Sequence, residues 1–147
     1  MPDYTLRPAS TSDLVPMMDI GHEGLRPHIE KVRSWNQLVE EEGFKKHFEP
    51  EKISIIQYNG VDVGYFKINE LEDNLFLEGI YLHRDARSRG IGAQLIQELS
   101  RTSEKPLALR VYKHNPAADL YRRLGFVVVS EDQDQYTMIR APSVKQQ

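Results

Sequence analysis

The segment with the strongest chemical signal in this chain combines two glycines with two arginines. Gly90-Ile91-Gly92 separates an apolar stretch from an amphipathic one, and Arg87 and Arg89 come just before it. If a strand precedes the glycines and a helix follows, the backbone can approach a ligand closely and the helix start offers unpaired N–H groups. Such a site suits an anion such as a pyrophosphate, although a lone Gly-x-Gly is more often a plain turn with solvated arginines.

Two other phosphate-binding loops do not fit this spacing. The dinucleotide fingerprint requires a third Gly or Ala where this chain has Leu95, and an acidic residue about 20 residues further on, where it has Leu109-Arg110-Val111. The nucleoside triphosphate loop requires Gly-Lys-Ser or Gly-Lys-Thr, which the sequence lacks.

A second pattern follows the glycine loop: Asn115-x-x-Ala118-x-x-Tyr121-x-x-x-Gly125-Phe126. Together with Arg87-x-x-Gly90-x-Gly92, it resembles the paired signatures of the GCN5-related N-acetyltransferase (GNAT) superfamily, in the same order and with a strand between them. The resemblance covers nearly the whole chain and is weakest over residues 21–50.

The resemblance implies how acetyl-CoA would be bound. The strand 75–83 would splay away from the strand 107–111, with the pantetheine arm in the gap, and Gly79 in mid-strand indicates either a bulge there or simple crowding in the sheet. One backbone group of that strand would polarise the thioester carbonyl, as in an oxyanion hole. The implied cofactor-binding residues are Ile80, Tyr81 and Leu82 for the pantetheine, the amides of Arg87, Ser88, Arg89, Gly90, Ile91 and Gly92 for the pyrophosphate, and Asn115 and Ala118 in the second signature.

Two residues are implied to be catalytic. Tyr121 would protonate the departing CoA thiolate, for which a phenol with a pKa near ~10 is suited; the alternative is a core aromatic beside Leu120 and Leu124. Glu78 would be the general base, acting through water on a protonated amine, as in the polyamine and aminoglycoside acetyltransferases that this strand resembles. Strand alternation leads us to expect Glu78 on an inward face, either used or paired in a salt bridge.

The acceptor side is less specific. Segments that line the acceptor groove in relatives contain several carboxylates, which would favour a cationic amine, and Glu70 or Glu72 could replace Glu78 as the base. The acceptor-side candidates are Glu23, Arg26, His28, Glu30, Trp35, Glu70 and Glu72. Separately, Asn115 of the second signature could also cap the helix that Pro116 opens. We predict no metal, because the histidines lack ligand spacing.

The element order expected from periodicity is that of an α/β domain with a mostly antiparallel sheet. Asn59-Gly60 predicts a hairpin between two β-rich runs. A helix is expected after Ser10–Asp13, broken by Gly21 and Gly24. A helical region over 26–48 follows, as one helix or as two pieces, and Pro27 could lie in its first turn. The resemblance implies a GNAT-like three-layer fold, with about seven strands and helices on both faces. The expected strands are a short first one ending at Leu6-Arg7, then 53–58, 61–68, 75–83, 107–111, 126–129 and 136–139, with helices after the glycine loop and from Asn115 to Gly125.

Composition limits the remaining classes. A chain of 147 residues suits one domain, here 1–147 with about 141–147 as a disordered tail. The net charge of −3, with no basic block, argues against nucleic-acid binding. The sequence has no cysteine, which removes a thiol nucleophile and favours direct transfer. No apolar run approaches the ~20 residues of a membrane span, and the N-terminus lacks a signal-peptide pattern, so we expect a cytoplasmic protein.

These patterns predict an N-acetyltransferase. It would transfer the acetyl group of acetyl-CoA, as cosubstrate, to a primary amine by direct attack in a ternary complex. The alternatives are a non-catalytic acyl-CoA-binding sensor on the same fold and a peptide or protein N-acetyltransferase. The acceptor is expected to be a small molecule or a peptide, and a homodimer would be in keeping with the resemblance.

Overall fold

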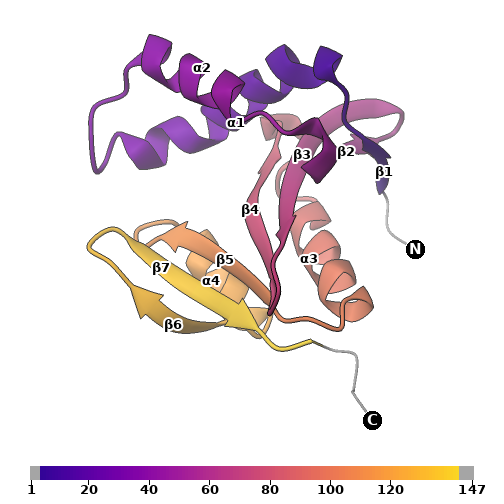
Figure 1. Cartoon of the computed structure of the whole chain (residues 1–147), viewed down its shortest axis with the longest axis vertical. Coiled ribbons are helices and arrows are strands. Elements are labelled where there is room, and N and C mark those ends of the chain that lie inside the picture. The colour runs from indigo at the N-terminus through magenta and orange to yellow at the C-terminus, as the bar shows by residue number, and fades with distance from the viewer. Residues whose placement is uncertain (1–3, 143–147) are drawn as a thin grey trace. The chain divides into compact units, whose positions relative to one another are not determined.

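The computed structural model describes residues 4–142, over which seven strands and four α-helices form (Figure 1). The chain order is β1 (Tyr4–Pro8), α1 (Leu14–Ile29), α2 (Gln37–Lys46), β2 (Ile53–Tyr58), β3 (Val61–Glu70), β4 (Leu75–Leu82), α3 (Ile91–Thr102), β5 (Leu107–Tyr112), α4 (Ala117–Arg123), β6 (Val127–Glu131) and β7 (Gln135–Arg140). Short 3-10 turns occupy Thr11–Asp13, Pro50–Lys52 and Arg84–Ala86.

The strands form one sheet in the order β1-β2-β3-β4-β5-β7-β6. The pairs β1/β2, β2/β3, β5/β7 and β6/β7 are antiparallel, whereas β4 and β5 are parallel. The parallel pair follows from α3, which lies between these two strands in the chain and can serve as a crossover. The prediction of an α/β fold with a mostly antiparallel, seven-stranded sheet is confirmed.

The chain divides into two compact units, each built from separate stretches of sequence. Unit 1 comprises Met1–Lys67 and Ile80–Arg89, and unit 2 comprises Ile68–Gly79 and Gly90–Gln147. Because β3 and β4 contribute residues to both units, neither unit corresponds to a continuous piece of chain. A single domain over 1–147 stays a prediction, and of the expected tail, residues 143–147 lie outside the described residues.

The core of unit 1 lies between its two long helices and the sheet. Ile53 and Ile55 alternate on one face of β2 and join Met17 of α1 and Tyr65 of β3 in a buried cluster. Phe44 of α2 packs against the same cluster, and α1 and α2 lie side by side (Figure 1). Both helices therefore belong to unit 1 through one shared apolar core.

Helix α1 continues through Gly21 and Gly24, so the break predicted there is wrong. A Cβ on Gly21 would lie 2.3 Å from the hydroxyl oxygen of Tyr65, and one on Gly24 would lie 3.5 Å from the ring of Tyr81. Gly21 therefore allows α1 to pack closely on Tyr65, whereas the contact at Gly24 is an ordinary van der Waals distance; the helix continues through both despite their low helix propensity.

The second helix also begins later than predicted. Pro27 lies inside α1, near its end, rather than in the first turn of a new helix. The chain leaves the helix between Glu30 and Asn36, and Trp35 falls in this connection. Asn36 caps α2, since its side chain accepts a hydrogen bond from the amide of Val39 at 3.1 Å.

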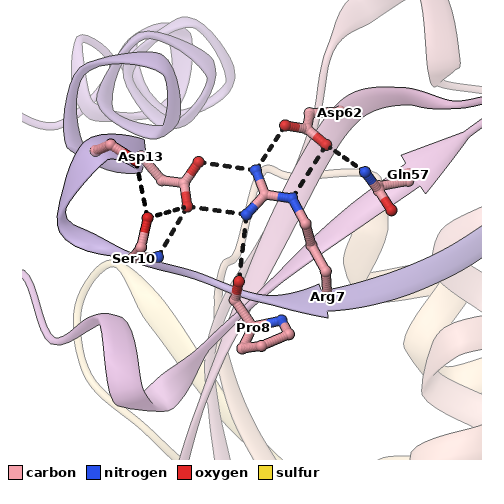
Figure 2. A network of polar contacts seen from close by, with 7 residues as sticks. Arg7, Pro8, Ser10, Asp13, Gln57 and Asp62 are labelled. Carbon is pink, nitrogen blue, oxygen red and sulfur yellow. Dashed lines mark hydrogen bonds and ion pairs between the residues drawn. The ribbon is translucent and has the colours of Figure 1, made fainter.

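A polar network fixes β1 to the rest of unit 1 (Figure 2). The guanidinium of Arg7 donates to both carboxylate oxygens of Asp13, at 3.0 and 2.8 Å, and to Asp62 of β3 at 2.6 Å. Asp13 is buried and also accepts from the amide of Ser10 at 2.8 Å. The hydrogen bonds from Arg7 are the main cause that lowers the pKa of Asp13 to about 2.

Unit 2 contains the helix–strand–helix segment that follows the glycine loop. Helix α3 buries Ile91, Leu95 and Ile96 at helical spacing. The last hairpin also forms where predicted, and Asp132 stabilises its turn by accepting from the amides of Asp134 and Gln135 at 2.9 and 2.7 Å.

Candidate functional site

The glycine loop joins a 3-10 turn to the start of α3, as the strand–loop–helix reading predicted. Ser88 and Gly90 both have left-handed backbone angles, with φ of 65° and 78°. Gly90 caps α3, and its carbonyl accepts from the amide of Gln94 at 3.0 Å. A Cβ on Gly90 would meet no described atom within 4 Å. The loop therefore turns sharply and leaves the backbone at the helix start open to a close approach.

The electrostatics of this helix start favour an anion. The first turn of α3 contains no acidic residue, so the N–H groups and the positive end of the helix dipole are not neutralised by a neighbouring carboxylate of that turn. The backbone of residues 90–92 thus has the chemistry that a phosphate group requires.

Both arginines of the loop are engaged with other parts of unit 1. The Nε of Arg87 donates to the carbonyl of Leu82 at 3.0 Å, and its Nη2 lies 3.4 Å from a carboxylate oxygen of Glu23 in α1. Arg89 donates to the carbonyl of Asp85 at 3.2 Å. The sequence predicted a role for the amides of these arginines and a charge for their side chains; the structure adds that the Arg87 side chain contacts β4 and α1.

Strand β4 pairs with β5 over a short distance only. The register joins Leu75 to Leu107 and ends at Leu77 with Leu109, whereas β4 itself continues to Leu82. The pairing is thus confined to the first three residues of β4, in keeping with the separation that the resemblance implies. A bulge at Gly79 stays a prediction.

The far end of β4, with Ile80, Tyr81 and Leu82, is supported by β3 within unit 1. The amide of His83 donates to the carbonyl of Val63 at 2.6 Å. A Cβ on Gly64 would lie 2.2 Å from the carbonyl oxygen of Tyr81 and 3.1 Å from the Cα of Leu82. Sequence reasoning missed Gly64, although a glycine inside a strand indicates close backbone approach.

Glu78 does not lie on the buried face of β4. Leu77 pairs with Leu109 and both are buried, at 3% and 2% exposure. Successive side chains of a strand point to opposite faces, so Glu78 points away from that core and is exposed. The expected inward position is therefore wrong, and the assignment of Glu78 as the base stays a prediction.

The second signature forms the start of α4 in unit 2. The side-chain oxygen of Asn115 accepts from the amide of Ala117, the first residue of α4, at 2.9 Å, while Pro116 occupies the N-cap position. Its amide nitrogen has no hydrogen-bond partner among the described residues. Ala118 is buried, and its amide donates to the carbonyl of Asn115 at 3.0 Å. The side chain of Asn115 can thus bind an amide at the start of α4 through its oxygen and still donate to a ligand through its nitrogen.

Tyr121 of α4 is largely buried. Its ring lies 5.7 Å from that of Phe126, centroid to centroid, and its carbonyl accepts from the amide of Phe126 at 3.0 Å. Gly125, with a φ of 98°, makes the turn that returns the chain to this contact. Burial raises the pKa of Tyr121, so its hydroxyl stays protonated at neutral pH. This packing supports the core-aromatic alternative and is equally what a proton donor needs.

The residues predicted on the acceptor side are partly joined by contacts. In unit 1, the ring of Trp35 packs edge-on against His22 at 5.1 Å, and the Arg26 guanidinium lies 5.5 Å from the Trp35 ring centroid. Arg26 also pairs with Glu30 at 3.3 Å. In unit 2, Glu70 pairs with Lys105 at 3.6 Å. These carboxylates therefore have cationic partners within the chain.

The predicted cofactor and catalytic residues divide between the units. Unit 1 holds residues 80–82 and 87–89, and unit 2 holds Glu78, residues 90–92, Asn115, Ala118 and Tyr121. Over residues 4–142, no group of three or more His, Asp or Glu side chains is placed to hold a metal ion. In the same part of the chain, none of the helices has the length and apolar character of a membrane span.

Comparison with known proteins defines the class to which this fold and loop belong. The family model described as "Acetyltransferase (GNAT) domain" matches residues 49–128, which include β2 to β5, the glycine loop and the second signature. The chain therefore belongs to the GNAT acetyltransferase family. The comparison with curated protein sequences finds no match.

Solved structures share the fold at low sequence identity. The PaiA N-acetyltransferase of Thermoplasma acidophilum, in complex with coenzyme A, is 16% identical with a TM-score of 0.75, over 94% of this chain and 98% of that one. The histone acetyltransferase HPA2 and related acetyltransferase of Corynebacterium glutamicum is 19% identical with a TM-score of 0.73, over 97% and 98%. The N-acetylglutamate synthase of Neisseria gonorrhoeae, complexed with coenzyme A and L-arginine, is 17% identical with a TM-score of 0.68, over 98% of this chain and 34% of that one.

Proposed function

We propose that this chain is an acetyl-CoA-dependent N-acetyltransferase that acts on a primary amine by direct attack in a ternary complex. The observation that carries the proposal is the glycine loop. Ser88 and Gly90 turn the backbone, Gly90 precedes α3, and a Cβ added to Gly90 would meet no described atom within 4 Å. Family membership supports the same conclusion.

The acyl-CoA would be held mainly by backbone groups. The amides from Arg87 to Gly92 would bind the pyrophosphate, with α3 supplying the dipole. Backbone groups of residues 80–82 would bind the pantetheine, and the free amide nitrogen of Asn115 would donate to the same arm. The contacts of Arg87 with Leu82 and Glu23 support this arrangement, because they keep the loop fixed in its turned conformation before a ligand binds.

The chemical step forms one bond and breaks one. The amine nitrogen attacks the thioester carbonyl, the C–N bond forms, and the C–S bond breaks to release the CoA thiolate. A backbone N–H of residues 80–82 would stabilise the oxyanion. Tyr121 would give its proton to the thiolate, and a carboxylate, Glu78 or else Glu70 or Glu72, would take the proton of the amine through water.

The test is an acceptor screen that follows CoA release over small amines, aminoglycosides and peptides, with acetyl-CoA binding measured in parallel by calorimetry. The proposal expects both binding and turnover with at least one class of amine. Turnover confined to peptides would indicate a peptide or protein N-acetyltransferase instead.

A non-catalytic acyl-CoA sensor is the second candidate. The position of Glu78 on the exposed face of β4 favours it, since a sensor needs no base. It expects acetyl-CoA binding without turnover for any acceptor in the screen.

A further inference from the structure

An arginine near the end of α1 lies on the ring of Trp35, the only tryptophan in the sequence. The guanidinium carbon of Arg26 is 5.5 Å from the centroid of that ring. The Nε of Arg26 lies 3.3 Å from a carboxylate oxygen of Glu30, and the side chain of Arg26 is 51% exposed. Within residues 4–142, the two terminal nitrogens of Arg26 donate no hydrogen bond. The guanidinium is therefore positioned by Trp35 and Glu30 and keeps its terminal N–H groups for a further partner.

The charge of Arg26 alone does not explain this arrangement. A cation in the last turn of a helix is stabilised by the helix dipole, but a lysine would serve that purpose equally well. A planar guanidinium on an aromatic ring is instead suited to bind a carboxylate through two parallel hydrogen bonds. By contrast, Arg33 in the connection to α2 donates to Glu40 at 3.1 Å, and Arg87 donates to the carbonyl of Leu82 at 3.0 Å.

A continuous series of aromatic rings joins Arg26 to the end of β4. Neighbouring ring centroids lie 5.3, 6.5, 5.7 and 5.1 Å apart along this series, which belongs entirely to unit 1 and consists of Tyr81, Tyr65, Phe44, His22 and Trp35. Arg26 is also tied to β4 through its own helix, because a Cβ on Gly24 would lie 3.5 Å from the ring of Tyr81. Arg26 follows Gly24 by two residues, about 3 Å along the helix axis. The packing of unit 1 thus fixes Arg26 relative to residues 80–82.

We propose that Arg26, positioned by Trp35, binds a carboxylate of the acceptor, so that the substrate is an amino acid or another amine that bears a carboxylate. This inference rests on the proposed function, in which residues 80–82 hold the thioester. Arg26 would determine specificity and take no part in proton transfer. It would also fix the direction in which the amine of the acceptor approaches the thioester.

The charges around Arg26 favour a carboxylate over other groups. A second cationic group on the acceptor would be repelled by Arg26, and the nearby carboxylates of Glu23 and Glu30 already pair with Arg87 and Arg26. A phosphate carries nearly two charges at neutral pH, and with Glu30 only 3.3 Å from Arg26 the site has too little positive charge to balance them. A single negative charge is therefore the best match.

Matched pairs of acceptors test the inference. Each pair consists of an amino acid and its amide, which lacks the negative charge, and the amino acids are alanine, phenylalanine, β-alanine and γ-aminobutyrate. We expect the acid of at least one pair to have a KM about tenfold lower than that of its amide, because hydrogen bonds between charged groups are stronger than neutral ones. No lower KM for the acid in any pair would overturn the inference, whereas turnover of the amides would leave the proposed function standing.

Substitutions show whether this preference depends on Arg26. Arg26→Lys keeps the positive charge at the end of the helix and removes the planar fork, and Trp35→Leu removes the ring on which the fork lies. Each is expected to raise the KM of the acid about tenfold and to leave kcat and the KM of the amide unchanged. Arg33→Lys is the matched control, because Arg33 is 53% exposed and already bound to Glu40. Equal effects of Arg26→Lys on acid and amide, or the same loss of preference in Arg33→Lys, would overturn the inference.

Fluorescence provides a measurement that does not require turnover. Because Trp35 is the only tryptophan, its emission reports on this site alone. In protein saturated with CoA, the acid is expected to change the emission at a concentration about tenfold lower than its amide, and Arg26→Lys is expected to remove that difference. Thermal unfolding checks that each variant is folded. If the wild type acetylates no amine, the proposed function fails, and the titration still decides the inference: acid and amide that bind equally, or no binding of either, would overturn it.

Discussion

Replacing Gly64 by alanine tests whether β3 positions the far end of β4. The new Cβ would lie 2.2 Å from the carbonyl oxygen of Tyr81 and 3.1 Å from the Cα of Leu82. Both contacts are with backbone atoms, so no side-chain rotation can relieve them. A normal carbon–oxygen contact is about 1 Å longer, and the end of β4 must therefore move by about that amount.

The size of the effect follows from this displacement. Overpacking of a closely packed site costs about 1–3 kcal/mol, so we expect Gly64→Ala to lower the free energy of unfolding by that amount. If residues 80–82 orient the thioester, a shift of about 1 Å is expected to lower kcat/KM by about 10²-fold. Urea unfolding measures the first effect, and steady-state kinetics with the best acceptor measure the second.

Gly43→Ala is the matched control for this experiment. Gly43 lies inside α2, and a Cβ there would meet no described atom within 4 Å. Alanine in a helix interior is expected to raise stability by about 0.5–1 kcal/mol. The reasoning would be refuted if Gly64→Ala were as stable as the wild type and bound acetyl-CoA unchanged.

Three further predictions concern protons. The pKa of Asp13 is lowered to about 2, below its usual value near 3.8, so its contribution to stability is present above about pH 4 and lost toward pH 2. Asp13→Asn is expected to flatten this part of the curve of unfolding free energy against pH, and an unchanged slope would exclude Asp13 as the source of the pH dependence. Tyr121→Phe keeps the contact with Phe126 and removes only the donor, so kcat is expected to fall ~10²–10⁴-fold with little change in acetyl-CoA affinity; full turnover would leave Tyr121 as a core aromatic. Glu78→Gln is expected to lose rate at neutral pH and partly recover it at high pH, where the amine deprotonates by itself; pH–rate profiles parallel to the wild type would exclude the general base.

Much of the fold could be predicted because local patterns and tertiary packing agree. Asn59-Gly60 adopts positive φ at both positions, 52° and 77°, as the hairpin between β2 and β3 requires. The apolar spacing of α3 matches the residues that it buries. In these segments the sequence alone contains the information that determines the element.

The errors occur where a tertiary contact outweighs a local pattern. The pattern around Gly21 and Gly24 indicated a break, but the helix is continuous, and the close approach of Tyr65 requires a small residue at position 21. The position of Glu78 was misjudged because alternation gives two faces and does not say which is buried. The pairing of Leu77 with Leu109 decides that question, and it depends on a contact 32 residues away in the chain.

For the candidate site, sequence spacing identified the loop and the second signature, and the structure adds their supports. The supporting role of Glu23 could not be assigned from the sequence, because it depends on its contact with Arg87. The role of Gly64 depends on the close approach of the β4 backbone, and the sequence indicated it only by a glycine inside a strand.

The most direct test of the central claim is acetyl-CoA binding by the Gly90 variants. Asn and Asp are nearly identical in shape, and both tolerate the left-handed angle of this position better than other residues, so Gly90→Asn and Gly90→Asp differ chiefly in charge. We expect calorimetry at low salt to detect binding by the wild type, weaker binding by Gly90→Asn and none by Gly90→Asp, since the carboxylate would repel the pyrophosphate. Equal affinity of the Asn and Asp variants, or a wild type that does not bind acetyl-CoA, would contradict a pyrophosphate site at the start of α3.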